Sequence, residues 1–173
     1  GLGSAYKDAI LHCFKNKNFR KLVTMDADGS HDPKYLPELF KKSETCDLVI
    51  GSRYVRGGGV QNWSIVRRLL SRFGNYYARL ITGIGIRDLT AGFIVVDKKI
   101  LEKINLDELT ANGYSYQIEF KFRCLESESG ISYAEVPIIF TERRQGKSKM
   151  SWGIVFEAIK VPWTLRKRHH IQK

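Results

Sequence analysis

The sequence predicts an α/β sandwich in which helices cover a mostly parallel central sheet. Short apolar segments alternate along the chain with longer segments whose apolar residues recur at helical spacing. Polar residues directly follow the apolar segment at 21–25, as they do at the carboxyl ends of buried parallel strands. With 173 residues, of which 43% are hydrophobic, the chain is long enough to form one domain with a buried core.

The individual elements follow from apolar spacing and from cap and breaker residues. Asp32 is a suitable N-cap for a helix that Pro33 begins, and Pro137 places the strand around it near a sheet edge. Up to residue 82 we expect a helix over 6–14, a buried parallel strand over 21–25, a helix over 33–43, a strand over 47–51, a glycine-rich loop over 52–62 and a helix over 65–82. Beyond it we expect a strand over 93–97, a short helix over 98–103, a helix over 116–128, a strand over 132–140, a basic loop over 143–150 and a helix over 151–166.

The charge and the cysteine content narrow the classes of partner. A net charge of +11 attracts phosphates on nucleotides, nucleic acids or anionic lipids. No RNA-binding, zinc-finger or helix-turn-helix signature is present, so we expect no nucleic acid partner. The three cysteines show no CxxC spacing, which argues against a zinc site or a disulfide framework and fits a reducing cytosol. No apolar run approaches the ~20 residues of a membrane-spanning helix, so we expect membrane contact to be peripheral.

The sharpest chemical signal is the pair Asp26 and Asp28 after the predicted strand 21–25. Ligands of open α/β sheets bind at that edge. Two carboxylates two residues apart in a turn can face one hard cation, and Mg²⁺ or Mn²⁺ prefers oxygen ligands that it shares with substrate phosphates. The alternative is a polar turn that only caps the following helix. His31, beside this turn, is expected to support the loop.

Several further motifs stand in order with this turn, and nearly the whole chain takes part. They are GLGSAY at 1–6, GSRY at 51–54, DLTAGF at 88–93, GYSYQIE at 113–119 and RRQGKSK at 143–149. Together they resemble the inverting glycosyltransferases of family two, and among them the polyprenyl-phosphate sugar synthases. The resemblance implies a GT-A (Rossmann-like) sandwich, with a catalytic domain over 1–165 and a basic tail over 166–173. A glycine-rich turn at residue 1 normally follows a strand, so we expect the first strands of the fold upstream.

The resemblance also implies a reaction: transfer of a hexose, of mannose or glucose type, from a sugar nucleotide such as GDP-mannose or UDP-glucose. The acceptor is a polyprenyl or dolichyl phosphate, the anomeric centre inverts, and Mg²⁺ or Mn²⁺ is the cofactor. A lipid monophosphate, with a second pKa of about 6, attacks without a general base. The alternatives are a related transferase acting on a saccharide hydroxyl, and a non-catalytic fragment or basic binding module.

Candidate site residues follow from the matched motifs. The resemblance implies a metal held by Asp26, Asp28 and Ser30, the last where some relatives carry Gln. The implied donor-binding residues are Asp26, Asp28, Arg53, Asp88, Gln117, Arg143 and Lys149. Those implied for the acceptor phosphate are Arg53, Arg67 and Lys147, and the catalytic set is Asp28, Arg53, Arg67 and Arg143. For Asp88 the alternatives are a sugar contact, the orientation of an arginine, or a turn aspartate bonded to nearby backbone.

The helix over 65–82 mixes arginines with apolar residues, a pattern of helices that lie on anionic lipid. The alternative, slightly favoured, is an ordinary amphipathic helix packed on the sheet. With a lipid acceptor, the expected location is the cytoplasm, at the cytoplasmic face of a membrane.

Overall fold

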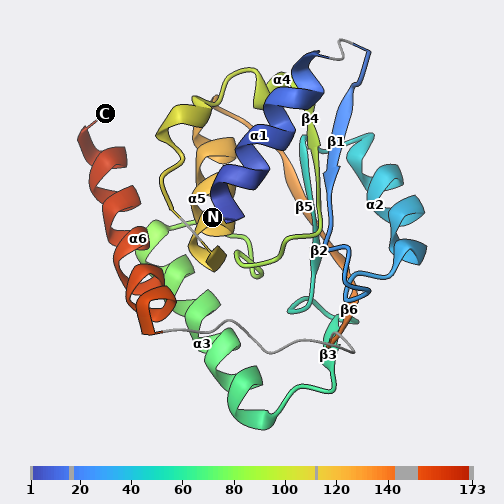
Figure 1. Ribbon diagram of the computed structural model, residues 1–173, viewed down its shortest axis with the longest axis vertical. Helices are drawn as coiled ribbons and strands as arrows, with labels where there is room; N and C mark the ends of the chain where they lie inside the picture. Colours follow the sequence, from blue (N-terminus) through green and yellow to red (C-terminus); the bar gives the residue numbers. More distant parts are fainter. Residues whose placement is uncertain (1, 16–17, 112, 143–151, 172–173) are drawn as a thin grey trace.

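A computed structural model describes residues 2–15, 18–111, 113–142 and 152–171, and it contains a central four-stranded sheet between layers of helices (Figure 1). The elements are α1 (Leu2–Lys15), β1 (Lys21–Thr24), η1 (Pro33–Tyr35), α2 (Leu36–Ser43), β2 (Leu48–Ser52), β3 (Gly59–Gln61), α3 (Ile65–Thr82), β4 (Ile94–Asp97), α4 (Lys98–Leu101), η2 (Leu106–Glu108), α5 (Gly113–Glu126), β5 (Tyr133–Pro137), β6 (Ile139–Thr141) and α6 (Trp152–Ile171). Asp32 caps the helical segment that begins at Pro33, as predicted, by accepting the N–H of Lys34.

The central sheet has the order β1-β4-β2-β5 and is mixed. Strands β1, β2 and β5 run in one direction, but β4 lies antiparallel between β1 and β2. The expectation of mostly parallel pairing is therefore corrected, because only β2 and β5 form a parallel pair within the described sheet. Strand β1 is half-buried and antiparallel to its neighbour, where a buried parallel strand was expected. Strand β5 lies at an edge, as Pro137 predicted.

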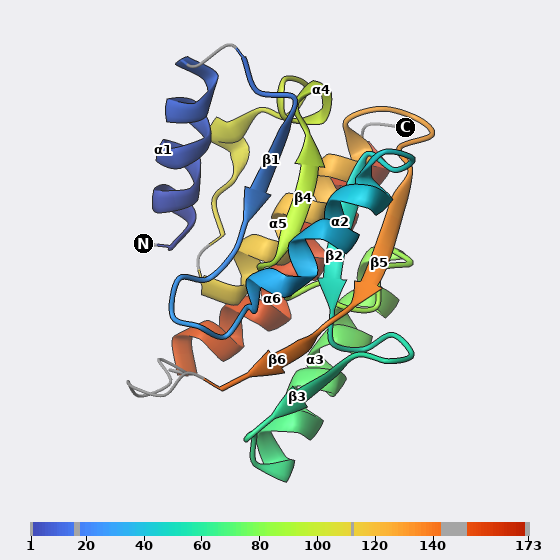
Figure 2. The same cartoon turned by 90° about the vertical axis from the view of Figure 1, so that its right-hand side faces the viewer.

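Helices cover both faces of the sheet (Figures 1 and 2). Side chains alternate along β4, so that Phe93 and Val95 enter the core beneath α2 while Ile94 and Val96 enter the larger core on the other face. Helices α1 and α5 lie over that second face, with α6 against α5 and α3 against α6. Strand β4 therefore contributes side chains to both cores.

A small second sheet, formed by β3 and β6, follows the carboxyl ends of β2 and β5. Strand β6 pairs in parallel with β3, which lies inside the segment expected to be only a glycine-rich loop. A side chain at Gly58 would place its Cβ 2.5 Å from the carbonyl oxygen of Ser52, so the chain can pass here only with glycine. Strands β3 and β6 extend away from the ends of β2 and β5 (Figure 2). They place the ring centroids of Trp63 and Phe140 at 5.5 and 5.6 Å from the guanidinium carbon of Arg53, which follows β2.

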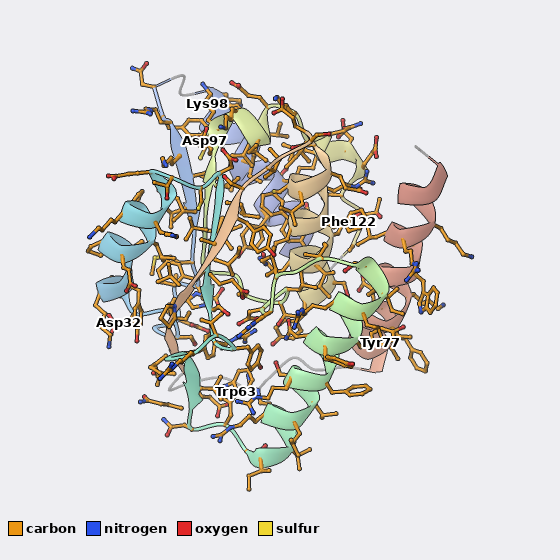
Figure 3. The ribbon with its side chains drawn as sticks, turned by 180° about the vertical axis from the view of Figure 1, so that it is seen from behind. Asp32, Trp63, Tyr77, Asp97, Lys98 and Phe122 are labelled. Atoms are coloured by element: carbon orange, nitrogen blue, oxygen red, sulfur yellow. The ribbon has the colours of Figure 1, made fainter. Side chains whose placement is uncertain are left out.

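Helix α3 spans the predicted residues, with Ser64 as its N-cap and Gly83, at φ +75°, ending it. Its apolar side chains, however, are largely exposed, which corrects the expectation that they pack on the sheet. The exposed set on α3 is Ile65, Val66, Leu69, Leu70, Phe73, Tyr76 and Leu80, and on α6 it is Phe156, Ile159 and Trp163. Tyr77 joins the two helices, since its hydroxyl accepts the indole N–H of Trp163 at 2.8 Å (Figure 3).

Helix α6 continues to Ile171, past the helix end expected at residue 166. In the part of the chain that the structure describes, no helix is both long and apolar enough to cross a membrane.

Candidate functional site

Three motif segments meet at one edge of the sheet. Strands β1 and β2 end there, and the antiparallel β4 begins there, so residues 25–28, residue 53 and residues 88–93 converge (Figure 2). The hydroxyl of Thr24 donates to the carbonyl of Gly92 at 2.7 Å, and the N–H of Gly51 donates to the carbonyl of Phe93 at 2.8 Å. These bonds fix the three segments to one another at the edge where open α/β sheets bind ligands.

The acidic turn presents two accessible carboxylates at this edge. The Asp26 side chain is 44% exposed, and Asp28 is also exposed. Oδ1 of Asp28 accepts the N–H of Ser30 at 3.0 Å, and Gly29, at φ +80°, permits this tight turn. The turn therefore holds Asp28 in place while leaving carboxylate oxygens directed toward a ligand-accessible surface.

His31 supports the turn from behind. Its Nδ1 accepts the N–H of Asp26 at 2.8 Å, and its ring packs against those of Phe93 and Phe140. Burial lowers the pKa of His31 below its ordinary value, although Asp26 opposes this. An accepting Nδ1 also requires the unprotonated nitrogen. The expectation that His31 supports the loop is confirmed.

The two carboxylates suit a hard divalent cation, whereas Ser30 does not complete the expected set. Ser30 is only 2% exposed, and its carbonyl accepts the N–H of Thr141. Its position is that of a loop support, so the third ligand expected there is not supported. No group of three or more His, Cys, Asp or Glu side chains arranged for a metal occurs among the described residues. Asp26 and Asp28 match the oxygen donors that Mg²⁺ or Mn²⁺ shares with substrate phosphates and water.

Behind the acidic turn, Arg53 and Asp88 form a buried ion pair. Nε and Nη2 of Arg53 donate to the two carboxylate oxygens of Asp88 at 2.8 and 2.6 Å, and Nη2 also donates to Thr90 at 2.8 Å. Asp88 is 0% exposed. Burial alone would raise the pKa of Asp88, but the charge and hydrogen bonds of Arg53 lower it. The expected contact between Asp88 and the donor is therefore corrected, because an inaccessible carboxylate orients the arginine instead.

A buried lysine holds the chain segment that carries Asp88. Nζ of Lys121 donates to the carbonyls of Leu89 and Ala91 at 3.0 and 2.6 Å, and burial lowers the pKa of Lys121 to about 7. Our sequence reasoning missed this residue. The signal was its helical spacing, three residues after Ile118 and four before Leu125, which places a lysine on the inward face.

Three polar groups converge above Gly92. A Cβ at Gly92 would lie 3.6 Å from each of Tyr6 Oη, Asp26 Oδ1 and Gln117 Nε2. The structure thus brings the predicted Gln117 to the acidic turn, and it adds Tyr6, which sequence reasoning did not single out. Burial raises the pKa of Tyr6, and the charge of Asp26 adds to that shift. The available signal was its place at the end of the GLGSAY motif.

Arg67 lies at the first turn of α3, beside Trp63 (Figure 3). Its guanidinium carbon is 4.1 Å from the Trp63 ring centroid, and that of Arg53 is 5.5 Å from it. Arg67 also forms an ion pair with Glu142. Arg53 and Arg67, both predicted site residues, therefore lie beside the same aromatic ring. The other predicted cations, Arg143, Lys147 and Lys149, lie outside the described residues.

A cavity of about 770 Å³ lies at the other end of the sheet, where β1 begins and β4 ends. No predicted site residue lines it. We place the candidate site at the acidic edge instead, because the motif segments and their carboxylates converge there.

Comparison with known proteins gives a matching family model and similar curated proteins. The family model described as glycosyl transferase family 2 matches residues 1–105. The chain is 44% identical over 171 residues to the polyprenol monophosphomannose synthase of Mycolicibacterium smegmatis, covering 97% of this chain and 63% of that protein. It is 43% identical over 159 residues to the undecaprenyl-phosphate mannosyltransferase of Micrococcus luteus, covering 92% and 64%. The chain thus spans just under two thirds of the length of these curated relatives.

Proposed function

Since the chain belongs to glycosyl transferase family 2, we propose that it carries the catalytic edge of a metal-dependent mannosyltransferase. The donor is a sugar nucleotide, the acceptor is a polyprenyl phosphate, and the anomeric configuration inverts. The observation that carries this proposal is the exposed Asp26–Asp28 turn at the same edge as the buried Arg53–Asp88 pair. Both relatives are named for mannose and for a polyprenyl carrier, which favours mannose over glucose.

On the donor side, Asp26 and Asp28 would hold Mg²⁺ or Mn²⁺. The ion would supply neutralisation of the charge that grows on the departing diphosphate. His31 fixes the backbone of Asp26, and Tyr6, which is half-buried, stands beside its carboxylate, placed to contact the donor sugar. Gln117 also lies beside this carboxylate, but it is only 4% exposed and supports the group from within. The rigid support of this turn favours catalysis because its carboxylates need little reorganisation when the donor binds.

On the acceptor side, the reaction needs cations near an incoming phosphate and no general base. Arg67, beside Trp63, supplies a partly exposed guanidinium, while Arg53, which is only 7% exposed and paired with Asp88, adds charge from a buried position. The carboxylates of Asp88 and Glu142 are already engaged by Arg53 and Arg67. They are therefore poorly placed to take a proton from a sugar hydroxyl, which supports a phosphate acceptor over a saccharide.

The exposed faces of α3 and α6 support a peripheral position on the membrane that holds a lipid acceptor. Helices α3 and α6 lie against each other, each with exposed apolar side chains, and Arg68 and Arg72 are exposed among those of α3. Helices with this composition bind the interface of anionic bilayers without crossing it. The first turn of α3 carries Arg67, so a lipid phosphate at the membrane surface would lie near the transfer site.

The proposal is tested by a transfer assay with matched acceptors. Purified protein is given radiolabelled GDP-mannose or UDP-glucose, with undecaprenyl phosphate or undecaprenol in detergent micelles, in Mn²⁺, Mg²⁺ or EDTA. We expect mannose transfer to the phosphate only, dependent on a divalent ion, and a product of inverted configuration by NMR. Equal rates with the phosphate and the free alcohol would contradict direct attack by the acceptor phosphate.

A further inference from the structure

A basic pocket lies along α3, separate from the candidate site at the acidic edge. It encloses about 250 Å³ and is lined by Tyr54, Arg72, Asn75, Arg79 and Arg87. None of these residues belongs to the donor, metal or acceptor sets described above. The pocket is large enough for a phosphate group with some of its water.

The pocket is built by regular spacing on one helix and by the loop that follows it. Residues 72, 75 and 79 of α3 lie on one helical face, and Arg87 follows the helix. Asn75 is buried, and its amide donates to Ser71 and to the hydroxyl of Thr90 and accepts the N–H of Thr90. The pocket wall is therefore anchored to the same segment that carries Asp88.

The charges around this pocket have no counterion among the described residues that line it. Three guanidinium groups line it, the lining contains no carboxylate, and none of the three forms an ion pair within the described residues. The nearby carboxylate of Glu135 accepts the backbone N–H groups of residues 87 and 88. The Nε of Arg79 is buried and has no hydrogen-bond partner in the described structure. Like charges that share a pocket repel, so the three guanidinium groups favour a bound anion.

We propose that this pocket is a second anion site that binds a phosphate group. Guanidinium forks match phosphate oxygens, and three of them line this pocket. The ring of Tyr54 stands between this site and the transfer site, with the guanidinium carbons of Arg53 and Arg72 at 5.3 and 5.9 Å from its centroid. The phosphate comes from a lipid headgroup or from a soluble compound, and exposed apolar residues on α3 favour the lipid. This inference does not depend on the proposed transferase activity.

The first test observes the Arg79 Nε–H resonance by NMR during titration with inorganic phosphate. We expect a saturable shift of that resonance, and an apparent affinity about ten-fold weaker in Arg87→Gln and in Arg72→Gln, each of which removes one charge-assisted partner. Arg68→Gln is the matched control, because it removes the same charge from an exposed position on α3 outside the pocket. No saturable shift, or an equal loss in the control, would overturn the proposal.

The second test identifies the source of the phosphate. Sedimentation with vesicles of phosphatidylcholine containing 20% phosphatidylglycerol is compared with pure phosphatidylcholine vesicles for the same variants. If a lipid headgroup is the ligand, Arg87→Gln lowers binding to anionic vesicles several-fold more than Arg68→Gln does. If the two variants bind vesicles equally while the phosphate titration still separates them, the site serves a soluble phosphate.

Discussion

Asp88 and the Asp26–Asp28 pair occupy the same sheet edge but differ completely in their surroundings. Asp88 is 0% exposed and is held by Arg53, whereas the Asp26 side chain is 44% exposed in a turn fixed through its backbone. A buried carboxylate with all its oxygens engaged organises the site, and an exposed one is available to a ligand. A place in a motif therefore does not by itself make a carboxylate accessible to a ligand.

The largest expected effect separates these two kinds of carboxylate by activity. Asp28→Asn keeps the side-chain shape and an oxygen that can accept the N–H of Ser30, but it removes the charge that would hold the metal. We expect transfer to fall about 1000-fold, within the range for loss of a preorganised electrostatic group, with an unchanged melting temperature. If Asp28→Asn retained more than a tenth of the wild-type activity, Asp28 would not be a metal ligand.

The second-largest effect is on stability, and it distinguishes the buried carboxylate of Asp88 from an exposed one. Asp88→Asn leaves Arg53 buried without a counterion, and we expect it to lower the free energy of unfolding by about 3–5 kcal/mol in urea titrations at pH 7. The matched control is Asp107→Asn at an exposed ion pair, where the aspartate side chain is 83% exposed and the loss should stay below about 1 kcal/mol. Similar losses in both variants would show that the Arg53–Asp88 pair has no special structural role.

Most of the fold was predictable because the signals for its helices and strands lie within or beside the segments that form them. Helix α3 has its cap, its apolar spacing and its glycine stop in the sequence, and the prediction matches the structure residue for residue. The α/β class and the GT-A fold are confirmed. The antiparallel direction of β4 was not predictable, because a short apolar strand carries no signal of its direction. The outward face of α3 was left open between a lipid-facing helix and one packed on the sheet, since apolar spacing does not say which partner covers it.

The site was predictable as a set of motifs but not as a division of roles. The convergence of Asp26, Asp28, Arg53 and Gln117 is observed. The burial of Asp88 is a consequence of tertiary packing on Lys121 and Arg53, which lie far from it in the chain. Local pattern therefore indicates which residues meet, while long-range packing decides which of them remain accessible.

The third effect concerns pH. The pKa of His31 is lowered by burial, so the folded state binds this proton less readily than the unfolded chain does. The stability that neutral His31 contributes is fully present above about pH 6.5 and is lost as pH falls toward its folded pKa, by up to about 1.4 kcal/mol per pH unit. Urea titrations from pH 7.5 to 5 should show a steeper loss in the wild type than in His31→Gln. The exposed His12→Gln is the control and should follow the wild type.

The smallest effect is expected at Tyr6. Tyr6→Phe removes one hydroxyl beside Asp26 and Gln117 while it keeps the stacking of the ring on Tyr116. Loss of one neutral hydrogen bond should lower kcat/KM about three- to ten-fold. Tyr133→Phe, on β5 and outside this convergence, should leave kcat/KM unchanged. If both variants behave alike, Tyr6 has only a packing role.

The central claim is that the exposed turn, and not the buried pair behind it, binds the metal and donor together. Calorimetric titration of GDP-mannose, with and without Mn²⁺, into the wild type and Asp28→Asn tests this most directly. The wild type should bind the donor about ten-fold or more tightly with Mn²⁺ than without it, a gain typical of a charge-assisted contact, and Asp28→Asn should show no such gain. An equal Mn²⁺-dependent gain in both proteins would contradict the account.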